Sequence, residues 1–281
     1  SLGSNLIMSV LTNIQTVPDF RLRGLNRTFL KHFIINCPVS CVSSVLLPVL
    51  KHLCPYVQSH MDQRWKYIKT VRENPNYDED NTDSQEVLDD IILRVMSREY
   101  IDTIKAILTS GSKSNSENGT QQNENSNIEN GVSSLSVTGE MALSDASLST
   151  SLVSTCLAGL SWPDSPASSK ACSLLEVMIP RLVEQGSLGQ EDANSLMMSV
   201  LKAFQDMGQF EANNIALTHL GLSCYELLRP RYSGVKEVFK LVPNCQQEDL
   251  DKFDSRIIAG QKGGDKVTHR NRKIDDKGFL T

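Results

Sequence analysis

The densest group of metal-ligating side chains is Cys37, Cys41, His52 and Cys54. Cysteine thiolates and histidine nitrogens are common zinc ligands, so this group could in principle bind zinc. However, the spacing C-x3-C-x10-H-x-C is not a common zinc pattern, and a proline directly follows Cys37 and Cys54. The alternative is that these cysteines fill buried positions at helix ends and turns, as free cysteine often does. We favour buried positions, and we predict neither a metal site nor a cofactor.

A thiol hydrolase would need a cysteine beside a histidine and an orienting acid. His219 and Cys224 are five residues apart on an expected helix, so they turn to different faces of it. The motifs G-x-S-x-G, G-x-x-x-x-G-K-[ST] and G-x-G-x-x-G do not occur. We therefore expect a protein that is not an enzyme.

Basic side chains are bunched along the sequence, although the formal charge of the chain is −5. One bunch lies between Lys51 and Arg72 with Trp65 and Tyr67 interleaved, and another lies in the segment LRPRY. Cationic side chains beside aromatic rings can bind the phosphate backbone of a nucleic acid. The candidate RNA-backbone residues are Arg64, Lys66, Lys69, Arg72, Arg229 and Arg231.

A secondary basic stripe, Arg23, Arg27 and Lys31, repeats every four residues on the side of its helix away from the apolar residues. For each stripe the simpler alternative is an ordinary solvated helix face, with Trp65 and the tyrosines packed in the core. The acidic counterpart runs from Tyr77 to Asp90 and contains no basic residue. Part of this acidic strip complements a helix N-terminus, and the rest is a solvated loop or a docking strip for a basic partner.

The elements that must position these residues are helices. Between Asp83 and Leu108 the apolar residues follow a period close to 3.6, and the segment from Phe20 to Asn36 behaves similarly. Further helical segments are Val42–Tyr67, bent by Pro48 and Pro55, a segment that closes near Gly208, and a segment that Pro230 ends. Strict alternation is absent, so we predict an all-α fold. Helices paired by short turns favour an α-solenoid of HEAT-type repeats, with a compact helical bundle as the alternative.

The chain divides into two helical blocks, 1–110 and 140–258. Between them, residues 111–139 are expected to form a disordered Ser/Asn/Gly-rich loop, since Ile128 is the only apolar residue between Gly111 and Gly131. Residues 259–281 are Gly-rich and basic, and we expect a flexible tail.

The composition excludes several classes of protein. A charge of −5 argues against a protein that coats nucleic acid through bulk charge, and 6% aromatic residues disfavour a strand-rich fold. The seven cysteines are an odd number without a signal peptide, so a disulfide framework is not expected. The longest apolar stretch, Val42–Leu50, is too short to span a membrane. Because the sequence opens on SLGSNLIMSVL without an initiator Met, we expect a fragment of a larger protein.

Several segments recur in one order in a known family. They are PDFRLR at 18–23, HMDQRWKYI at 60–68, DSQEVLDDIILRVMSREYIDTI at 83–104, SVLKAFQDMGQ at 199–209, YELLRPRY at 225–232 and DLDKFDSRI at 249–257. Together they resemble the C-terminal part of the exportin-5 family of karyopherin-β nuclear export receptors. The resemblance covers most of residues 15–258, and it departs from the family after Ile258, where a basic helical segment would be expected.

The resemblance implies an ARM-like superhelix of HEAT repeats and a receptor that is not an enzyme. The family binds Ran-GTP, mainly through an N-terminal arch that this chain lacks. It carries structured or double-stranded RNA such as pre-microRNA and tRNA, with some RNA-associated proteins. Such a receptor passes nuclear pore proteins and shuttles between nucleus and cytoplasm, without a membrane partner. Its RNA is held largely through backbone and shape, as expected for A-form duplexes. The alternative function is a solenoid scaffold that binds proteins only.

Overall fold

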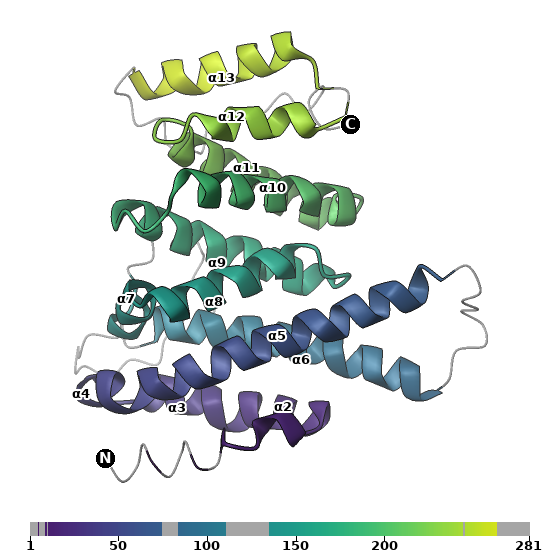
Figure 1. Ribbon diagram of the computed structural model, residues 1–281, viewed down its shortest axis with the longest axis vertical. Coiled ribbons are helices and arrows are strands. Elements are labelled where there is room, and N and C mark those ends of the chain that lie inside the picture. The colour runs from purple at the N-terminus through teal and green to yellow at the C-terminus, as the bar shows by residue number, and fades with distance from the viewer. Residues whose placement is uncertain are drawn as a thin grey trace, which may run out of the picture.

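The computed structural model describes residues 11–74, 84–110, 135–243 and 245–262, together with Asn5 and Ser9. Within these ranges the regular elements are helices, and no strand occurs. The helices pair into hairpins that stack along one axis, with the first and last helices at opposite ends of the stack (Figure 1). This arrangement confirms the predicted all-α solenoid of HEAT-type repeats. The predicted disordered loop lies mostly in residues 111–134, outside the described residues.

Two long helical runs begin the stack. After the 3-10 turn η1 (Ile14–Thr16), the first run joins α2 (Asp19–Gly24), η2 (Leu25–Leu30) and α3 (Lys31–Asn36). The second run joins α4 (Val39–Cys41), η3 (Val42–Leu46) and α5 (Leu47–Arg72). The turns of η2 and η3 are π-helical. Pro38 separates the runs because a residue before proline avoids the helical conformation, and Cys37 is accordingly extended. Pro55 lies inside α5, which continues past it to Arg72.

The remaining helices are shorter, apart from α6. They are α6 (Ser84–Thr109), α7 (Val137–Ser144), α8 (Ala146–Leu160), α9 (Ser165–Glu184), α10 (Gln190–Met207), α11 (Glu211–Leu228), α12 (Gly234–Val238), the 3-10 turn η5 (Phe239–Leu241) and α13 (Gln247–Lys262). The side chains of Ser136, Asp145 and Asp164 cap the starts of α7, α8 and α9 by accepting backbone N–H groups. Gly186, with φ of 67°, follows the end of α9 in the left-handed conformation that glycine adopts readily.

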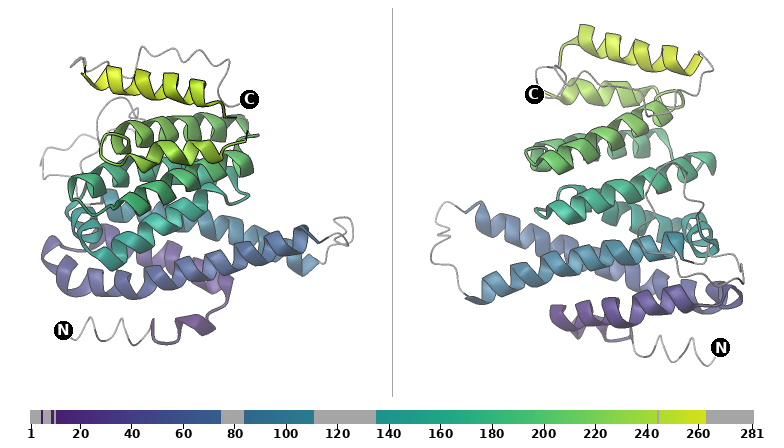
Figure 2. Two further views of the ribbon diagram at one scale, coloured as in Figure 1. Left: turned by 45° about the horizontal axis from the view of Figure 1, so that its top comes forward. Right: turned by 180° about the vertical axis from the view of Figure 1, so that it is seen from behind.

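The helices form two layers. The first layer contains the run from Asp19 to Asn36, followed by α6, α9 and α11, and the second contains α5, α8, α10 and α12 (Figures 1 and 2). Neighbours contact one another along each layer, and the hairpins α5–α6, α8–α9 and α10–α11 join the layers. Helix α13 packs at the far end against α11 and α12. Helices α5 and α6 extend past the other hairpins on one side (Figure 1).

One hydrophobic core runs through the whole stack, from Leu11 near the start to Ile257 in α13. The helical run Val39–Arg72 is long and apolar enough to cross a membrane by length and composition alone. Its side chains Leu50, Cys54 and Met61 are fully buried in this core, as expected of the central helix of a solenoid. The apolar stripe therefore has its partners inside the protein.

The structure places the helix ends close to their predicted positions. Helix α10 ends before Gly208 and α11 ends before Pro230, as predicted. Helix α7 begins at Val137, inside the stretch 111–139 predicted as loop. The Ser136 side chain caps the start of α7, and its hydroxyl also donates to the Ile107 carbonyl at the end of α6. Helix α13 continues to Lys262, past the predicted start of the tail at residue 259.

Candidate nucleic-acid interface

The α5–α6 hairpin carries four of the six candidate RNA-backbone residues. Trp65, which lies between Arg64 and Lys66 in the sequence, is only 5% exposed. Its ring stacks on that of Trp162 with 6.1 Å between ring centroids. Its indole N–H donates to the Ser97 hydroxyl at 2.9 Å. Trp65 is therefore a core anchor that fixes the rotation of α5, and it leaves Tyr67, which is 57% exposed, as the aromatic side chain on the surface.

Arg64 and Arg72 are held by carboxylates of the protein. Arg64 lies 3.1 Å from Asp19 and 3.3 Å from Asp89. The Arg72 guanidinium lies 3.3 Å from Asp90. The hydrogen bond from His60 and the charge of Arg64 hold the pKa of Asp19 below its usual value. Asp19 is therefore a stable anion, and Arg64 joins α5 to the start of α2.

Lys66 and Lys69 are the two candidates on α5 with exposed ammonium groups. No ion pair involves Lys66 in the described part of the chain, and Lys69 lies 3.7 Å from Glu73 with both side chains more than half exposed. Such an exposed pair contributes little, so a phosphate could replace Glu73 at small cost. Lys66 and Lys69 are three residues apart, so they are neighbours on the surface of α5 near its C-terminal end, which projects from the stack (Figure 1).

Arg229 and Arg231 lie near the far end of the stack and take part in packing. Arg229 binds Asp254 of α13 through two hydrogen bonds of 2.8 and 3.0 Å. Burial alone would raise the pKa of Asp254, but hydrogen bonds from Arg229, Tyr225 and Lys236 outweigh it, so this pKa lies below its usual value. Arg231 donates to the backbone carbonyl of Val183 at 2.7 Å, at the end of α9.

Among the described residues, the secondary basic stripe likewise contains one residue that is bound within the protein and two that are not. Arg23 binds Glu99 of α6 through two hydrogen bonds of 3.1 Å. Arg27 is exposed and Lys31 is half-buried, and neither forms an ion pair with another described residue. The structure therefore leaves four of the nine candidates available for a ligand: Lys66, Lys69, Arg27 and Lys31. Outside the candidate set, the cations that form no ion pair within the described ranges are Arg21, Lys105, Lys202 and Arg256.

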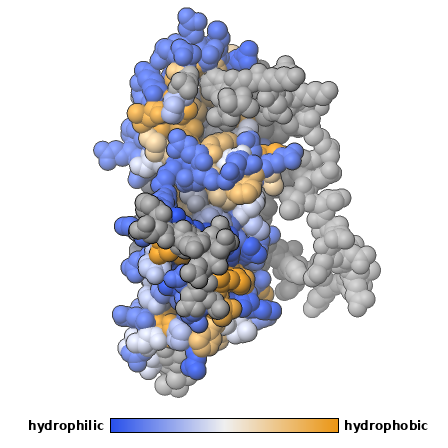
Figure 3. All heavy atoms as spheres, turned by 90° about the vertical axis from the view of Figure 1, so that its right-hand side faces the viewer, coloured by the Kyte–Doolittle hydropathy of each residue, from blue (hydrophilic) through white to orange (hydrophobic). Residues whose placement is uncertain are grey.

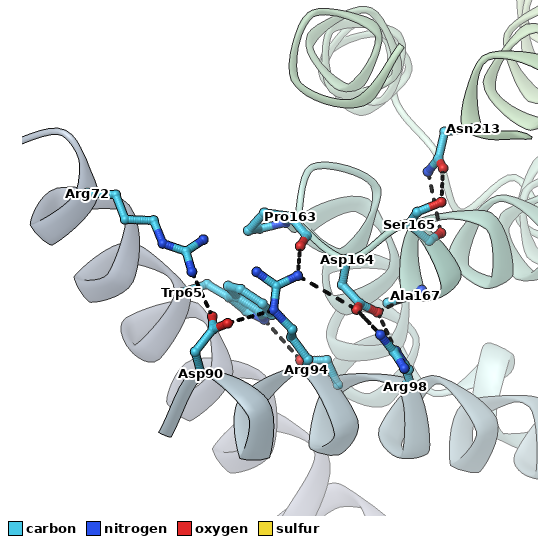
Figure 4. A network of polar contacts seen from close by, with 11 residues as sticks. Trp65, Arg72, Asp90, Arg94, Arg98, Pro163, Asp164, Ser165, Ala167 and Asn213 are labelled. Atoms are coloured by element: carbon cyan, nitrogen blue, oxygen red, sulfur yellow. Dashed lines mark hydrogen bonds and ion pairs between the residues drawn. The ribbon is translucent and has the colours of Figure 1, made fainter. Parts of the chain in front are cut away.

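A network at the edge of α6 was missed by the sequence reasoning (Figure 4). Asp90 accepts from Arg94 at 2.7 Å and pairs with Arg72, while Arg94 also donates to the Pro163 carbonyl and lies 5.8 Å above the Trp65 ring. The Arg98 guanidinium donates hydrogen bonds of 2.5 and 2.8 Å to the carboxylate of Asp164, the N-cap residue of α9. The spacing of Arg94 and Arg98 by four residues was a signal in the sequence, but their partners Pro163 and Asp164 lie more than 60 residues away along the chain.

Seen from the side on which α5 and α6 project, the described residues are mainly hydrophilic, with separate hydrophobic patches (Figure 3). Asp89 and Asp90, the described end of the predicted acidic strip, are paired with arginines of α5. Residues 77–83 of that strip lie outside the described residues.

The residues weighed for metal or thiol chemistry do not converge. Cys54 is fully buried, and burial raises the pKa of its thiol to about 12, whereas Cys37 and Cys41 are partly exposed. Among the described residues, His, Cys, Asp and Glu form no group of three or more that could hold a metal ion. His219 contacts Glu176, and the Cys224 thiol is buried, with its pKa raised mainly by that burial.

Comparison with known proteins supports the resemblance noted in the sequence. The sequence model of the Exportin-5 family matches residues 1–268. Exportin-5 of Mus musculus is 29% identical over 279 residues, which cover 94% of this chain and 23% of the relative. Exportin-5 of Homo sapiens is 28% identical over 291 residues, which cover 99% of this chain and 24% of the relative. The chain thus spans about a quarter of the length of these relatives, and because the family match covers nearly all of its residues, it belongs to the exportin-5 family.

Proposed function

We propose that this chain forms C-terminal HEAT-type repeats of a nuclear export receptor that carries structured RNA, such as pre-microRNA or tRNA, together with Ran-GTP. The observation that carries the proposal is the family match over residues 1–268 of a continuous helical stack. In this proposal Ran-GTP binds mainly to repeats outside this chain, and the receptor passes nuclear pore proteins as it shuttles between nucleus and cytoplasm. It carries cargo and catalyses no reaction.

The RNA contacts of this segment are proposed to be electrostatic and few. Lys66 and Lys69 have exposed ammonium groups on the projecting end of α5, beside the exposed ring of Tyr67. Arg27 and Lys31 are spaced by one helical turn on the first helical run. Side chains of this kind contact phosphates and sugars of an A-form duplex without reading its sequence. The arginines that pair with Asp or Glu in the structure are assigned to holding the helices in place.

A titration of the full-length receptor with hairpin RNA tests the proposed function. The RNA is titrated with and without Ran loaded with a non-hydrolysable GTP analogue, and Ran loaded with GDP serves as the control. Ran-GTP is expected to tighten RNA binding, and by thermodynamic linkage RNA tightens Ran-GTP binding by the same factor. Equal RNA affinity in all three conditions would contradict the proposed Ran-dependent function, and a lack of RNA binding in all three would favour the alternative, a solenoid scaffold that binds proteins only.

A further inference from the structure

Side-chain contacts join the α5–α6 hairpin to the helices that follow it, α7, α8 and α9. Helix α6 ends at Thr109 and α7 begins at Val137, and residues 111–134 between them lie outside the described part. We propose that the packed junction, and not this connection, holds the two halves of the molecule together. Each half then presents a complete and specific binding face for the other half, independently of any cargo.

The first row of contacts lies along α5. Lys51, Gln58 and Trp65 are spaced by seven residues, which is close to two helical turns, so they share one side of the helix. Each contacts a residue of the second half. The Lys51 ammonium lies 2.6 Å from the Asp145 carboxylate, and the Ser151 hydroxyl donates to the side-chain carbonyl of Gln58 at 3.1 Å. The ring of Trp65 stacks on that of Trp162 with 6.1 Å between centroids.

The second row lies along α6. Arg94, Arg98 and Asp102 are spaced by four residues and face the α8–α9 turn and the start of α9. Arg94 donates to the Pro163 carbonyl, Arg98 grips Asp164, and Asp102 accepts from the Lys170 ammonium at 2.8 Å (Figure 4 shows the first two of these contacts).

The charges across the junction fix the register of the two halves. The first half supplies a cation, a cation and an anion in Lys51, Arg98 and Asp102, and the second half supplies the opposite charges. A slip of one half along the other would place like charges together, which is unfavourable. Asp164 contributes most to this register, because its side chain is only 1% exposed and it accepts three hydrogen bonds from Arg98.

The end of α6 closes the junction. The Ser136 N–H donates to the Leu108 carbonyl at 2.8 Å, and the Ser136 hydroxyl donates to the Ile107 carbonyl at 2.9 Å. These bonds satisfy carbonyls that a free helix C-terminus leaves unpaired. The apolar core is also shared, since Leu53 and Ile104 of the first half belong to the same cluster as Leu152 and Leu175 of the second.

Cutting the connection in the intact protein tests the proposal. A recognition sequence for a specific protease is inserted between residues 119 and 126 of the 281-residue chain, and cleavage is verified on a denaturing gel. Size exclusion with light scattering then gives the native mass, and near-ultraviolet circular dichroism reports the two tryptophans, one in each half. We expect the two pieces to co-elute as a one-to-one complex with the spectrum of the uncut protein. Separation of the pieces at micromolar concentration would overturn the proposal.

Variants of the cut protein test whether the charged contacts set the specificity. Arg98→Met keeps the aliphatic stem but removes the guanidinium, and Asp164→Ser keeps an oxygen that can cap α9. Each is expected to raise the dissociation constant of the two pieces by about tenfold or more. Arg181→Met is the matched control, because Arg181 pairs with Glu140 and Glu184 within the second half. Equal effects of Arg98→Met and Arg181→Met would overturn the proposed register.

Discussion

At the scale of residues, the main finding is that an arginine in a basic stripe can serve the fold instead of a ligand. Arg229 stands in YELLRPRY, one of the segments that carry the family resemblance, and the structure shows it bound to the nearly buried Asp254. The sequence itself shows that the cations are bunched. It could not reveal the partners, because Asp254 lies 25 residues away and the pairing requires α13 to fold back on α11.

Asp254→Asn should destabilise the protein in a pH-dependent way. The pKa of Asp254 in the folded chain lies below its ordinary value of 3.8. The ionised carboxylate therefore stabilises the fold at pH values above about 4, and this contribution disappears as the pH falls through the lowered pKa. We expect the variant to lose about 2 kcal/mol in the free energy of unfolding at pH 7, measured by urea denaturation, with a smaller loss below pH 4.

Asp249→Asn is the control for this prediction. Asp249 lies 3.5 Å from Lys252 on the same helix, with both side chains more than half exposed. Its removal should change the free energy of unfolding by less than about 0.5 kcal/mol. Equal losses for the two variants at pH 7 would contradict the role assigned to the Asp254 carboxylate.

The cysteines should divide into two classes by reactivity. Cys54, Cys156, Cys172 and Cys224 are buried, and burial raises the pKa of Cys54 and Cys172 to about 12. Thiolates are the reactive species, so these four should resist a thiol reagent at pH 8 in the native protein. Cys37, Cys41 and Cys245 are partly exposed and should react. A zinc site would instead protect Cys37, Cys41 and Cys54 together, with release of zinc on labelling.

At the scale of elements, periodicity predicted the long helices and chain breakers predicted several ends. The start of α7 was assigned to loop, because its anchor is a contact with the end of α6 that no local pattern reveals. The π-helical turns of η2 and η3 were equally invisible, since a widened turn changes the period over only a few residues. A tertiary contact therefore decided where α7 begins.

Two substitutions of glycine by alanine should have opposite effects. A Cβ atom at Gly139 in α7 would lie 2.8 Å from the backbone carbonyl oxygen of Leu108, so α7 would have to move away from α6. A Cβ atom at Gly24 would meet no atom within 4 Å. Gly139→Ala should lower the free energy of unfolding by about 1–3 kcal/mol, and Gly24→Ala should raise it by about 0.5–1 kcal/mol. Thermal unfolding measures both, and stabilisation by Gly139→Ala would contradict the close approach of α7 to α6.

At the scale of the whole molecule, the net charge of −5 does not show how the arginines and carboxylates are paired between the helices. Arg23, Arg98 and Arg229 pair with carboxylates of neighbouring helices, so the stack is held together by internal charge pairing as well as by its core. The fold class was predictable because each hairpin repeats the same apolar pattern. The candidate interface was only partly predictable, because a cation is available to RNA only when no neighbouring helix supplies an acid.

The proposed RNA interface is tested most directly by the salt dependence of RNA binding to the full-length receptor with Ran-GTP. Lys66→Glu with Lys69→Glu is compared with the control Lys240→Glu with Lys252→Glu, which reverses two exposed lysines that pair with acids near the far end of the stack. The first pair should weaken hairpin RNA binding and reduce the slope of log affinity against log salt by about 1.5, as expected for two lost phosphate contacts. The control should leave the slope unchanged. An unchanged affinity and slope for the Lys66 and Lys69 variant would contradict the RNA interface proposed for α5.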